Sequence, residues 1–179
     1  MHTREALLPD AEHIYRLISN YSGDGTLLPR TFPEICENVR DFVVLERDRE
    51  DRRGELGDAE IIGCGALHLY GPHLAEIRSI TVDPEHQHSG CGRLLVEAVL
   101  AQAERHQVGC ICLFTRTPEF FARLGFHVAQ REDLPDKINK DCVNCPRFHR
   151  CDEVAMVRGE IPSYSAASFS GPQLVSLEA

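Results

Sequence analysis

The order of apolar and polar residues along the chain predicts a succession of strands and helices. Short apolar or alternating runs, typical of strands, cover residues 3–6, 42–45, 61–70, 74–82, 110–114, 126–129 and 154–158. Apolar residues at helical spacing predict helices over residues 11–20, 92–107 and 118–124, and a further short helix from Thr31. The charged segment 46–60 is typical of a hairpin tip. We expect one domain over residues 1–160 and a loose tail over residues 161–179.

Charge and composition narrow the classes of protein to which the chain can belong. Its 179 residues include 28 acidic and 19 basic side chains, which gives a formal net charge of −9. An acidic chain disfavours non-specific binding to nucleic acid or to an anionic membrane. No apolar run approaches the roughly 20 residues that cross a bilayer, and the first residues lack the basic-then-apolar order of a signal peptide. We therefore expect a cytoplasmic protein with neither nucleic acid nor membrane as a partner.

A glycine-containing loop joins the strand at 74–82 to the helix at 92–107. It contains Gln87-x-x-Gly90-x-Gly92, so several backbone N–H groups converge on the first turn of a helix, a geometry that binds phosphate groups. The two glycines leave no side chain to keep phosphate oxygens from these amides. The segment matches neither the three-glycine dinucleotide fingerprint nor the Gly-Lys-Ser/Thr of a P-loop. Taken alone, the loop is also compatible with a simple chain reversal.

Two segments in this order resemble the motifs of the GNAT acetyltransferases. The loop resembles motif A, Arg/Gln-x-x-Gly-x-Gly/Ala, and Phe120-Phe121-Ala122-Arg123-Leu124-Gly125-Phe126 resembles the family's Phe-Tyr-x-x-x-Gly-Phe. The resemblance covers about residues 3–158 and implies an α/β fold, the GNAT fold, with a mixed, mainly antiparallel sheet flanked by helices. It implies acetyl-CoA as the cosubstrate, with the backbone N–H near Val82 as the catalytic donor to the oxyanion. It also implies a cosubstrate-binding set of Ile80, Val82, Gln87, Ser89, Gly90, Cys91, Gly92 and Arg93.

Further segments resemble one branch of this family, the short amino-acid N-acetyltransferases that make N-acetylglutamate at the first step of arginine biosynthesis. These segments are Leu-Leu-Pro-Arg at 27–30, Asn-Val-Arg-Asp-Phe at 38–42, Gly-Cys-Gly-Ala-Leu at 63–67, Ala-Glu-Ile-Arg at 75–78 and Leu-Pro at 134–135. The resemblance implies transfer of acetyl from acetyl-CoA to the α-amino group of L-glutamate, with a small amino acid as the partner. It does not extend to the kinase-like domain of the long synthases, so regulation by arginine is not implied. The sequence leaves the oligomeric state undecided, with a homodimer as one alternative.

Acetyl transfer to an amine requires a base, because an ammonium group must lose a proton before its nitrogen can attack. Glu76, in the strand before the loop, is the candidate catalytic base, acting through water; the alternative is a surface carboxylate paired with Arg78. Guanidinium groups are the natural bidentate partners of the glutamate carboxylates. The candidate substrate-binding residues are Arg30, Arg78, Arg116, Arg147 and Arg150. Arg30 ranks first, because it precedes the second helix where this fold builds its acceptor site, and a solvated surface position is the alternative for each arginine.

One position departs from the family pattern. The family often has a tyrosine as general acid for the CoA thiolate at the second aromatic position of its Phe-Tyr pair, and this chain has Phe121 there. The thiolate would then leave unprotonated or take a proton from water. The glutamate branch also lacks this tyrosine, and the acid step stays unassigned.

A late loop gathers three thiols and one imidazole. Cysteines in a reducing cytosol seldom serve as disulfides, and the spacing Cys142-x-x-Cys145 is a usual first half of a zinc site. The candidate metal ligands are Cys142, Cys145, His149 and Cys151, which would hold a structural zinc ion. The alternatives are free thiols packed in the loop or a labile redox pair.

Two other functions stay open at this point. The first is the same chemistry on another amine, such as a different amino acid, a polyamine or a protein N-terminus. The second is a protein that binds CoA without turnover and senses metal or redox state through the cysteine loop, which the absence of a hydroxyl at Phe121 keeps open.

Overall fold

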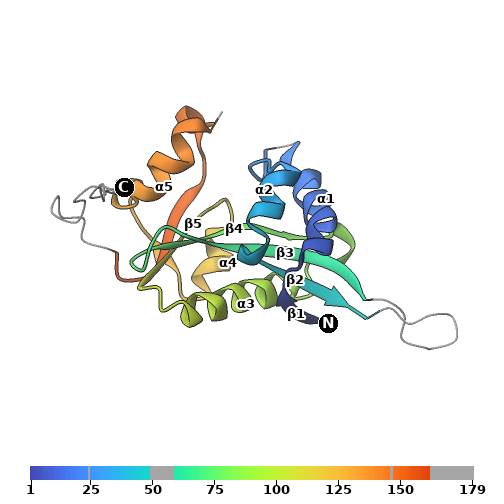
Figure 1. The fold of residues 1–179 in the computed structure, drawn as a ribbon. Coiled ribbons are helices and arrows are strands. Elements are labelled where there is room, and N and C mark those ends of the chain that lie inside the picture. The colour runs from blue at the N-terminus through green and yellow to red at the C-terminus, as the bar shows by residue number, and fades with distance from the viewer. Residues whose placement is uncertain (24, 49–58, 146, 162–179) are drawn as a thin grey trace, which may run out of the picture.

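A seven-stranded mixed sheet forms the centre of the computed structural model, which describes residues 1–23, 25–48, 59–145 and 147–161 (Figure 1). The strands are β1 (His2–Glu5), β2 (Phe42–Arg47), β3 (Glu60–Leu69), β4 (Ala75–Val82), β5 (Cys110–Thr115), β6 (His127–Val128) and β7 (Val154–Gly159), in the spatial order β1-β2-β3-β4-β5-β7-β6. β4 and β5 are parallel, and the other neighbouring pairs are antiparallel. The expected hairpin tip at 49–58 and the tail from residue 162 lie outside the described residues.

Helices cover both faces of this sheet. They are α1 (Ala11–Ser22), α2 (Phe32–Glu37), α3 (Cys91–Arg105), α4 (Pro118–Ala122) and α5 (Pro135–Lys140). Helices α1, α2 and α5 lie on one face, and α3 and α4 lie on the other (Figure 1). Among the described residues, none of these helices combines the length and the apolar character that a membrane crossing requires.

The pattern of apolar residues explains how the two layers of helices pack. In β5, Ile111 and Leu113 pack with Val99 of α3 in the largest core cluster. The alternate residues of this strand, including Cys112, pack with Leu134, which directly precedes α5. This alternation is the period of two that a strand with both faces covered requires.

A bulge in β4 changes which residues face α3. Strict alternation, which the sequence predicts, would place Ile77 and Ser79 on the same face of the sheet. Instead, the pairing with β3 shifts between Cys64 and Ala66, and Ser79 adopts a positive φ of 56°. One extra residue on the bulged strand reverses the facing of all that follow. Ile77 therefore packs on the α3 side before the bulge, and Ile80 packs there after it.

The strands β4 and β5 pair only over the first part of β4. The described register joins Ala75 to Ile111 and Glu76 to Cys112, and no further pair follows toward the end of β4. Residues 77–82 therefore border an opening in the sheet. The sequence contains no direct sign of this separation, because apolar periodicity specifies faces and not the distance between neighbouring strands.

The late part of the chain differs most from the sequence-based prediction. The strand expected at 126–129 is only two residues long, and helix α5 forms where a loop was expected. Short 3-10 helices occupy Arg131–Asp133, Cys142–Asn144 and Phe148–Arg150. Local propensity is a weak signal in such short elements, and tertiary packing of residues such as Leu134 decides them.

Candidate functional site: two cavities that meet where the sheet opens

Backbone N–H groups of β4 face the opening between β4 and β5. The Asp83 N–H donates to the carbonyl oxygen of Ile62 on β3, at 2.8 Å. Successive residues of an antiparallel strand direct their N–H and C=O groups to opposite sides. The N–H groups of Val82 and Ile80 therefore point away from β3 and toward the opening. This orientation is the one expected of donors that line an extended ligand and polarise a carbonyl group.

The loop after β4 connects this strand to the N-terminus of α3. Gly90 caps this helix in the left-handed region, with φ of 88°, which a residue without Cβ adopts readily. The adjoining cavity is lined by six of the eight predicted cosubstrate-binding residues: Ile80, Val82, Gln87, Gly90, Gly92 and Arg93. The amides at the start of this 15-residue helix carry the partial positive charge that attracts a pyrophosphate.

Two predicted residues of this loop direct their side chains elsewhere. The Cys91 side chain is buried in the core beside Leu95, so only its backbone can serve a ligand. The Ser89 hydroxyl donates to the carbonyl oxygen of His86. The structure also adds a residue that the sequence analysis missed: the Tyr21 hydroxyl, from α1, donates to the Val82 carbonyl oxygen at 2.8 Å and accepts from Gln87 at 2.7 Å.

A second cavity lies on the α1, α2 and α5 side of the opening. Its lining includes six basic side chains, which are Arg30, Arg78, Arg116, Arg131, Lys137 and Arg147, and two acidic ones, Glu76 and Glu153. A chain of net charge −9 thus concentrates positive charge in one cavity. We call this second cavity the acceptor-side cavity, after the acceptor site expected there. A further cavity connects it with the one at the α3 N-terminus, because it shares Arg78 with the former and Ile80 and Phe120 with the latter.

Arg30 and Arg78 are two arginines of this cavity whose charges lack a close carboxylate partner. Among the described residues, none forms a hydrogen bond or ion pair with the Arg30 side chain. Arg78 is mostly buried, and its ion pairs with Asp41 and Asp141 are long, at 3.9 and 4.0 Å. Burial and the nearby charge of Arg30 lower the pKa of Arg78. An anion bound beside both groups would therefore relieve an electrostatic cost already present in the protein.

The other predicted arginines have different surroundings. The Arg116 guanidinium donates to the Asp152 carboxylate at 2.8 Å and to the Gly25 carbonyl oxygen at 3.1 Å. Arg147 donates to the same Gly25 carbonyl at 3.0 Å. These two side chains hold the loop between α1 and α2 over the cavity. Arg150 is exposed and lies outside the cavity lining, so its prediction as a substrate ligand is not supported.

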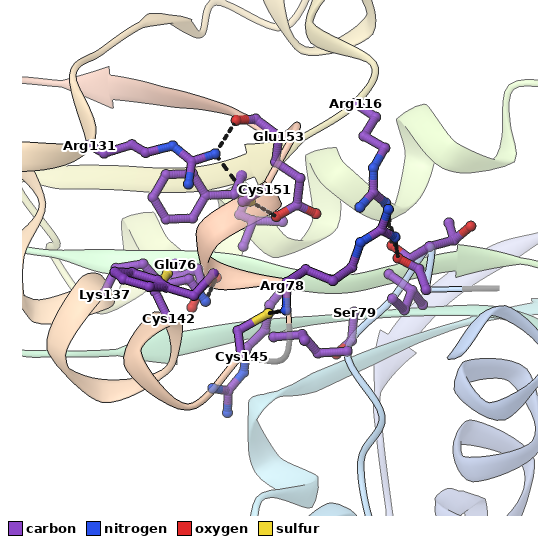
Figure 2. A pocket seen from close by; sticks show the side chains of 18 of the residues that line it. Glu76, Arg78, Ser79, Arg116, Arg131, Lys137, Cys142, Cys145, Cys151 and Glu153 are labelled. Carbon is purple, nitrogen blue, oxygen red and sulfur yellow. Dashed lines mark hydrogen bonds and ion pairs between the residues drawn. The ribbon is translucent and has the colours of Figure 1, made fainter. Parts of the chain in front are cut away.

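Glu76 is buried in a network of charges rather than exposed beside Arg78. Its Oε1 lies 2.7 Å from Nζ of Lys137 (Figure 2). Its Oε2 accepts a hydrogen bond from the Tyr70 hydroxyl at 2.9 Å. Lys137 also contacts Asp141 at 2.9 Å. Burial opposes the charge of Lys137, but the two carboxylates outweigh it and raise the pKa of this ammonium. The alternative of a surface carboxylate paired with Arg78 is therefore wrong.

Comparison with known proteins identifies the family to which this chain belongs. The family described as "Acetyltransferase (GNAT) domain" matches residues 38–128 of this chain. An uncharacterised N-acetyltransferase of Chlorobaculum tepidum is 40% identical over 155 residues, which cover 87% of this chain and 94% of that relative. The chain belongs to the GNAT acetyltransferases. The expected fold and the acyltransferase class are thereby confirmed.

Two further relatives of this GNAT acetyltransferase have more specific names. An amino-acid acetyltransferase of Mycobacterium tuberculosis is 35% identical over 69% of this chain and 66% of its own length. The N-acetylglutamate synthase of Neisseria gonorrhoeae, solved in complex with coenzyme A and N-acetylglutamate, aligns with a TM-score of 0.71 at 28% identity. That alignment covers 87% of this chain and 34% of the synthase, so this acetyltransferase spans about a third of the length of that relative.

The acetyltransferase contains two cavity residues that the sequence analysis missed. Arg131 and Lys137 lie in the segment between β6 and β7, which was expected to be a loop. The Arg131 guanidinium donates to the Cys151 sulfur at 3.1 Å and to the Glu153 carbonyl oxygen. Lys137 follows the family-like Leu-Pro at 134–135, which was the available signal for it, and Arg131 precedes that segment.

Phe121, which stands where the family often has a tyrosine, serves the packing of the core. Its ring is buried against Phe126 in the core of the acetyltransferase. The connecting cavity instead presents the hydroxyl groups of Thr115 and Thr117, which lie 3.1 Å apart at the start of α4. These hydroxyls, rather than an aromatic one, border the passage through which a thioester would reach the acceptor side.

The zinc prediction is not supported by the positions of its ligands. In the part of the chain that the structure describes, no three His, Cys, Asp or Glu side chains are grouped so that they could hold a metal ion. Cys145 and Cys151 accept hydrogen bonds from Arg147 N and Arg131 Nη2 instead, and the His149 ring packs against Phe148. The spacing Cys-x-x-Cys by itself was therefore not sufficient to predict a metal site.

Proposed function

We propose that this acetyltransferase transfers the acetyl group of acetyl-CoA to the α-amino group of L-glutamate. The observation that carries the proposal is the pair Arg30 and Arg78, two incompletely compensated guanidinium groups in one cavity beside the opening of the sheet. Glutamate brings two carboxylates to such a cavity, and guanidinium groups bind carboxylates in a bidentate geometry. The product, N-acetyl-L-glutamate, would serve arginine biosynthesis.

The cosubstrate is proposed to lie along the opening between β4 and β5. Its pyrophosphate would bind the amides at Gly90, Cys91 and Gly92, where the α3 N-terminus favours an anion. Its pantetheine arm would accept hydrogen bonds from Ile80 N–H and place the thioester carbonyl beside Val82 N–H. The relatives support this proposal, since the gonococcal synthase was solved with coenzyme A in complex.

The reaction follows from these positions. The substrate ammonium loses a proton to Glu76 through a water molecule, and the free amine nitrogen attacks the thioester carbon. The Val82 N–H stabilises the oxyanion that forms. The carbon–sulfur bond then breaks, and the thiolate leaves toward Thr115 and Thr117 and takes a proton from water.

The test is a substrate panel with acetyl-CoA. Release of CoA is measured by chromatography, which avoids interference from the protein's own thiols, with L-glutamate, L-aspartate, L-glutamine, glycine, spermidine and a short peptide as acceptors. We expect kcat/KM to be highest for L-glutamate. Turnover confined to spermidine or the peptide, which lack the paired α- and γ-carboxylates of glutamate, would overturn the proposal and favour another amine. CoA binding without turnover would overturn the proposal as well.

A further inference from the structure

Three of the eight cysteines line the acceptor-side cavity, and the proposed reaction uses none of them. Cys142, Cys145 and Cys151 are half-buried there, whereas Cys64, Cys110 and Cys112 are buried in the core, where burial raises the pKa of each thiol. A buried thiol of raised pKa reacts slowly with oxidants, since the thiolate is the reactive form. Burial raises the pKa of the Cys142 thiol as well, but all three cavity thiols border a space that small reagents can enter.

Cys151 has a fixed cation against its sulfur. Nη2 of Arg131 donates to Sγ of Cys151 at 3.1 Å, and the same guanidinium is anchored by the Glu153 carbonyl oxygen. Figure 2 shows Arg131, Cys151 and Glu153 joined in this way at one side of the cavity. Sγ of Cys151 in turn donates to Oε2 of Glu153 at 3.7 Å. Among the three cavity cysteines, Cys151 is thus the one whose sulfur lies between a guanidinium and a carboxylate.

The other two cysteines share one turn. The Cys145 N–H donates to the Cys142 carbonyl oxygen at 3.0 Å, so the two residues are the ends of a 3-10 turn. Side chains three positions apart in such a turn eclipse one another, and both cysteines border the same cavity as Cys151. Each end of the turn thus contributes one thiol, that of Cys142 or of Cys145, to the lining of the cavity.

We propose that Cys151 is a peroxide-reactive site whose oxidised form is resolved as a disulfide by a thiol of the 142–145 turn, which closes the acceptor-side cavity. In the first step the Cys151 thiolate attacks hydrogen peroxide, its sulfur gains one oxygen as a sulfenic acid, and hydroxide leaves. In the second step a thiol of the turn attacks the sulfenic sulfur, the disulfide forms, and water leaves. The peroxide is the two-electron oxidant, and a dithiol reductant reverses the change.

The disulfide would have a consequence for binding that rests on the proposed function. It would draw Cys151 from Arg131 and link the segment before β7 to the turn after α5, across the space assigned to the acceptor. The three cysteines are absent from the lining of the cavity at the α3 N-terminus. Oxidation should therefore abolish acceptor turnover and spare the binding of CoA.

The chemistry is tested by peptide mass spectrometry after treatment with hydrogen peroxide, without reference to activity. We expect a reducible cross-link between Cys151 and the 142–145 turn. In Cys151→Ser the cross-link should be lost, and in Cys142→Ser/Cys145→Ser the oxidation should stop at a sulfenic acid that dimedone traps. Arg131→Met should slow the reaction of Cys151. Cys36→Ser, a half-buried cysteine outside the cavity, is the matched control and should cross-link as the wild type does.

Two results would overturn the inference in different ways. Equal oxidation of Cys36 and Cys151, or a Cys151 rate unchanged in Arg131→Met, would show that no activated thiol exists. A cross-link that forms while acetyl transfer and acceptor KM stay unchanged would show that the cavity does not close. If instead the substrate panel rejected glutamate but the cross-link formed, the proposed function would fail and the thiol site would stand.

Discussion

Nζ of Lys137 lies 2.7 Å from Oε1 of Glu76, and both side chains are almost wholly buried. The pair joins α5, in the late part of the chain, to β4, the strand that leads to the glycine-containing loop before α3. A buried charge pair of this kind is sensitive to the loss of one partner, because the other charge is then left in a medium of low polarity.

Removal of Lys137 is therefore expected to destabilise the fold. Lys137→Met leaves the Glu76 carboxylate buried beside Tyr70 without its cation, which should cost about 3–5 kcal/mol in the free energy of unfolding. Urea denaturation measures this value. The double variant Glu76→Gln/Lys137→Met should recover much of the loss. Asn139→Ala, an exposed change on the same helix, is the control and should alter stability by no more than about 0.5 kcal/mol. A similar loss in Lys137→Met and Asn139→Ala would refute the prediction.

Arg30 is expected to act on the acceptor and not on the cosubstrate. Arg30→Ala should raise the KM for L-glutamate by about tenfold or more, because a charge-assisted hydrogen bond contributes about 1.5–3 kcal/mol. The KM for acetyl-CoA should change little, since Arg30 is absent from the lining of the cavity at the α3 N-terminus. Initial-rate kinetics with each substrate varied in turn distinguish the two. Arg105→Ala, whose native arginine pairs with Glu5 on the surface, is the control; equal effects on both KM values would count against the assignment.

A side chain at position 63 is expected to disturb the donors of β4. A Cβ on Gly63 would lie 2.9 Å from the Thr81 carbonyl oxygen and 2.9 Å from Cδ1 of Leu95, so the β4 backbone must shift. Gly63→Ala should cost about 1–3 kcal/mol of stability and raise the KM for acetyl-CoA, because Val82 N–H moves with the strand. Gly23→Ala meets open space and is the matched control. Unchanged acetyl-CoA kinetics in a folded Gly63→Ala protein would show that Val82 is not in the binding path.

Asp10 is expected to make stability depend on acid pH. The hydrogen bond from Arg4 lowers the pKa of the Asp10 carboxyl, and the Leu7 N–H adds to this effect. A carboxyl of lowered folded-state pKa contributes its full stability above its unfolded pKa of about 4 and loses it as pH falls through the folded value. Asp10→Asn removes this contribution. The difference in unfolding free energy between wild type and variant should thus be constant above about pH 5 and shrink below pH 4; a difference that grew toward acid pH would contradict the assignment.

The sequence by itself determined most of the helices and strands and the glycine-containing loop between β4 and α3. Periodicity placed α1, α3 and the strands around β4, and the Gln-x-x-Gly-x-Gly spacing placed the amides of α3 beside β4, because these signals are local. The change of apolar positions from Ile77 to Ile80 was a visible sign of the bulge. Arg30 and Arg78, which the structure places in one cavity, were likewise candidates from the sequence.

Only the tertiary structure decided which charges meet. Lys137 pairs with Glu76 and Arg131 with Cys151 because α5 and β7 fold back onto β4 and β5, and such long-range contacts leave no periodic trace in the chain. The same is true of the opening between β4 and β5, which depends on strand pairing that ends after Glu76. Local sequence specified the glycine-containing loop before α3, and the packing of distant segments specified the cavity lined by Arg131 and Lys137.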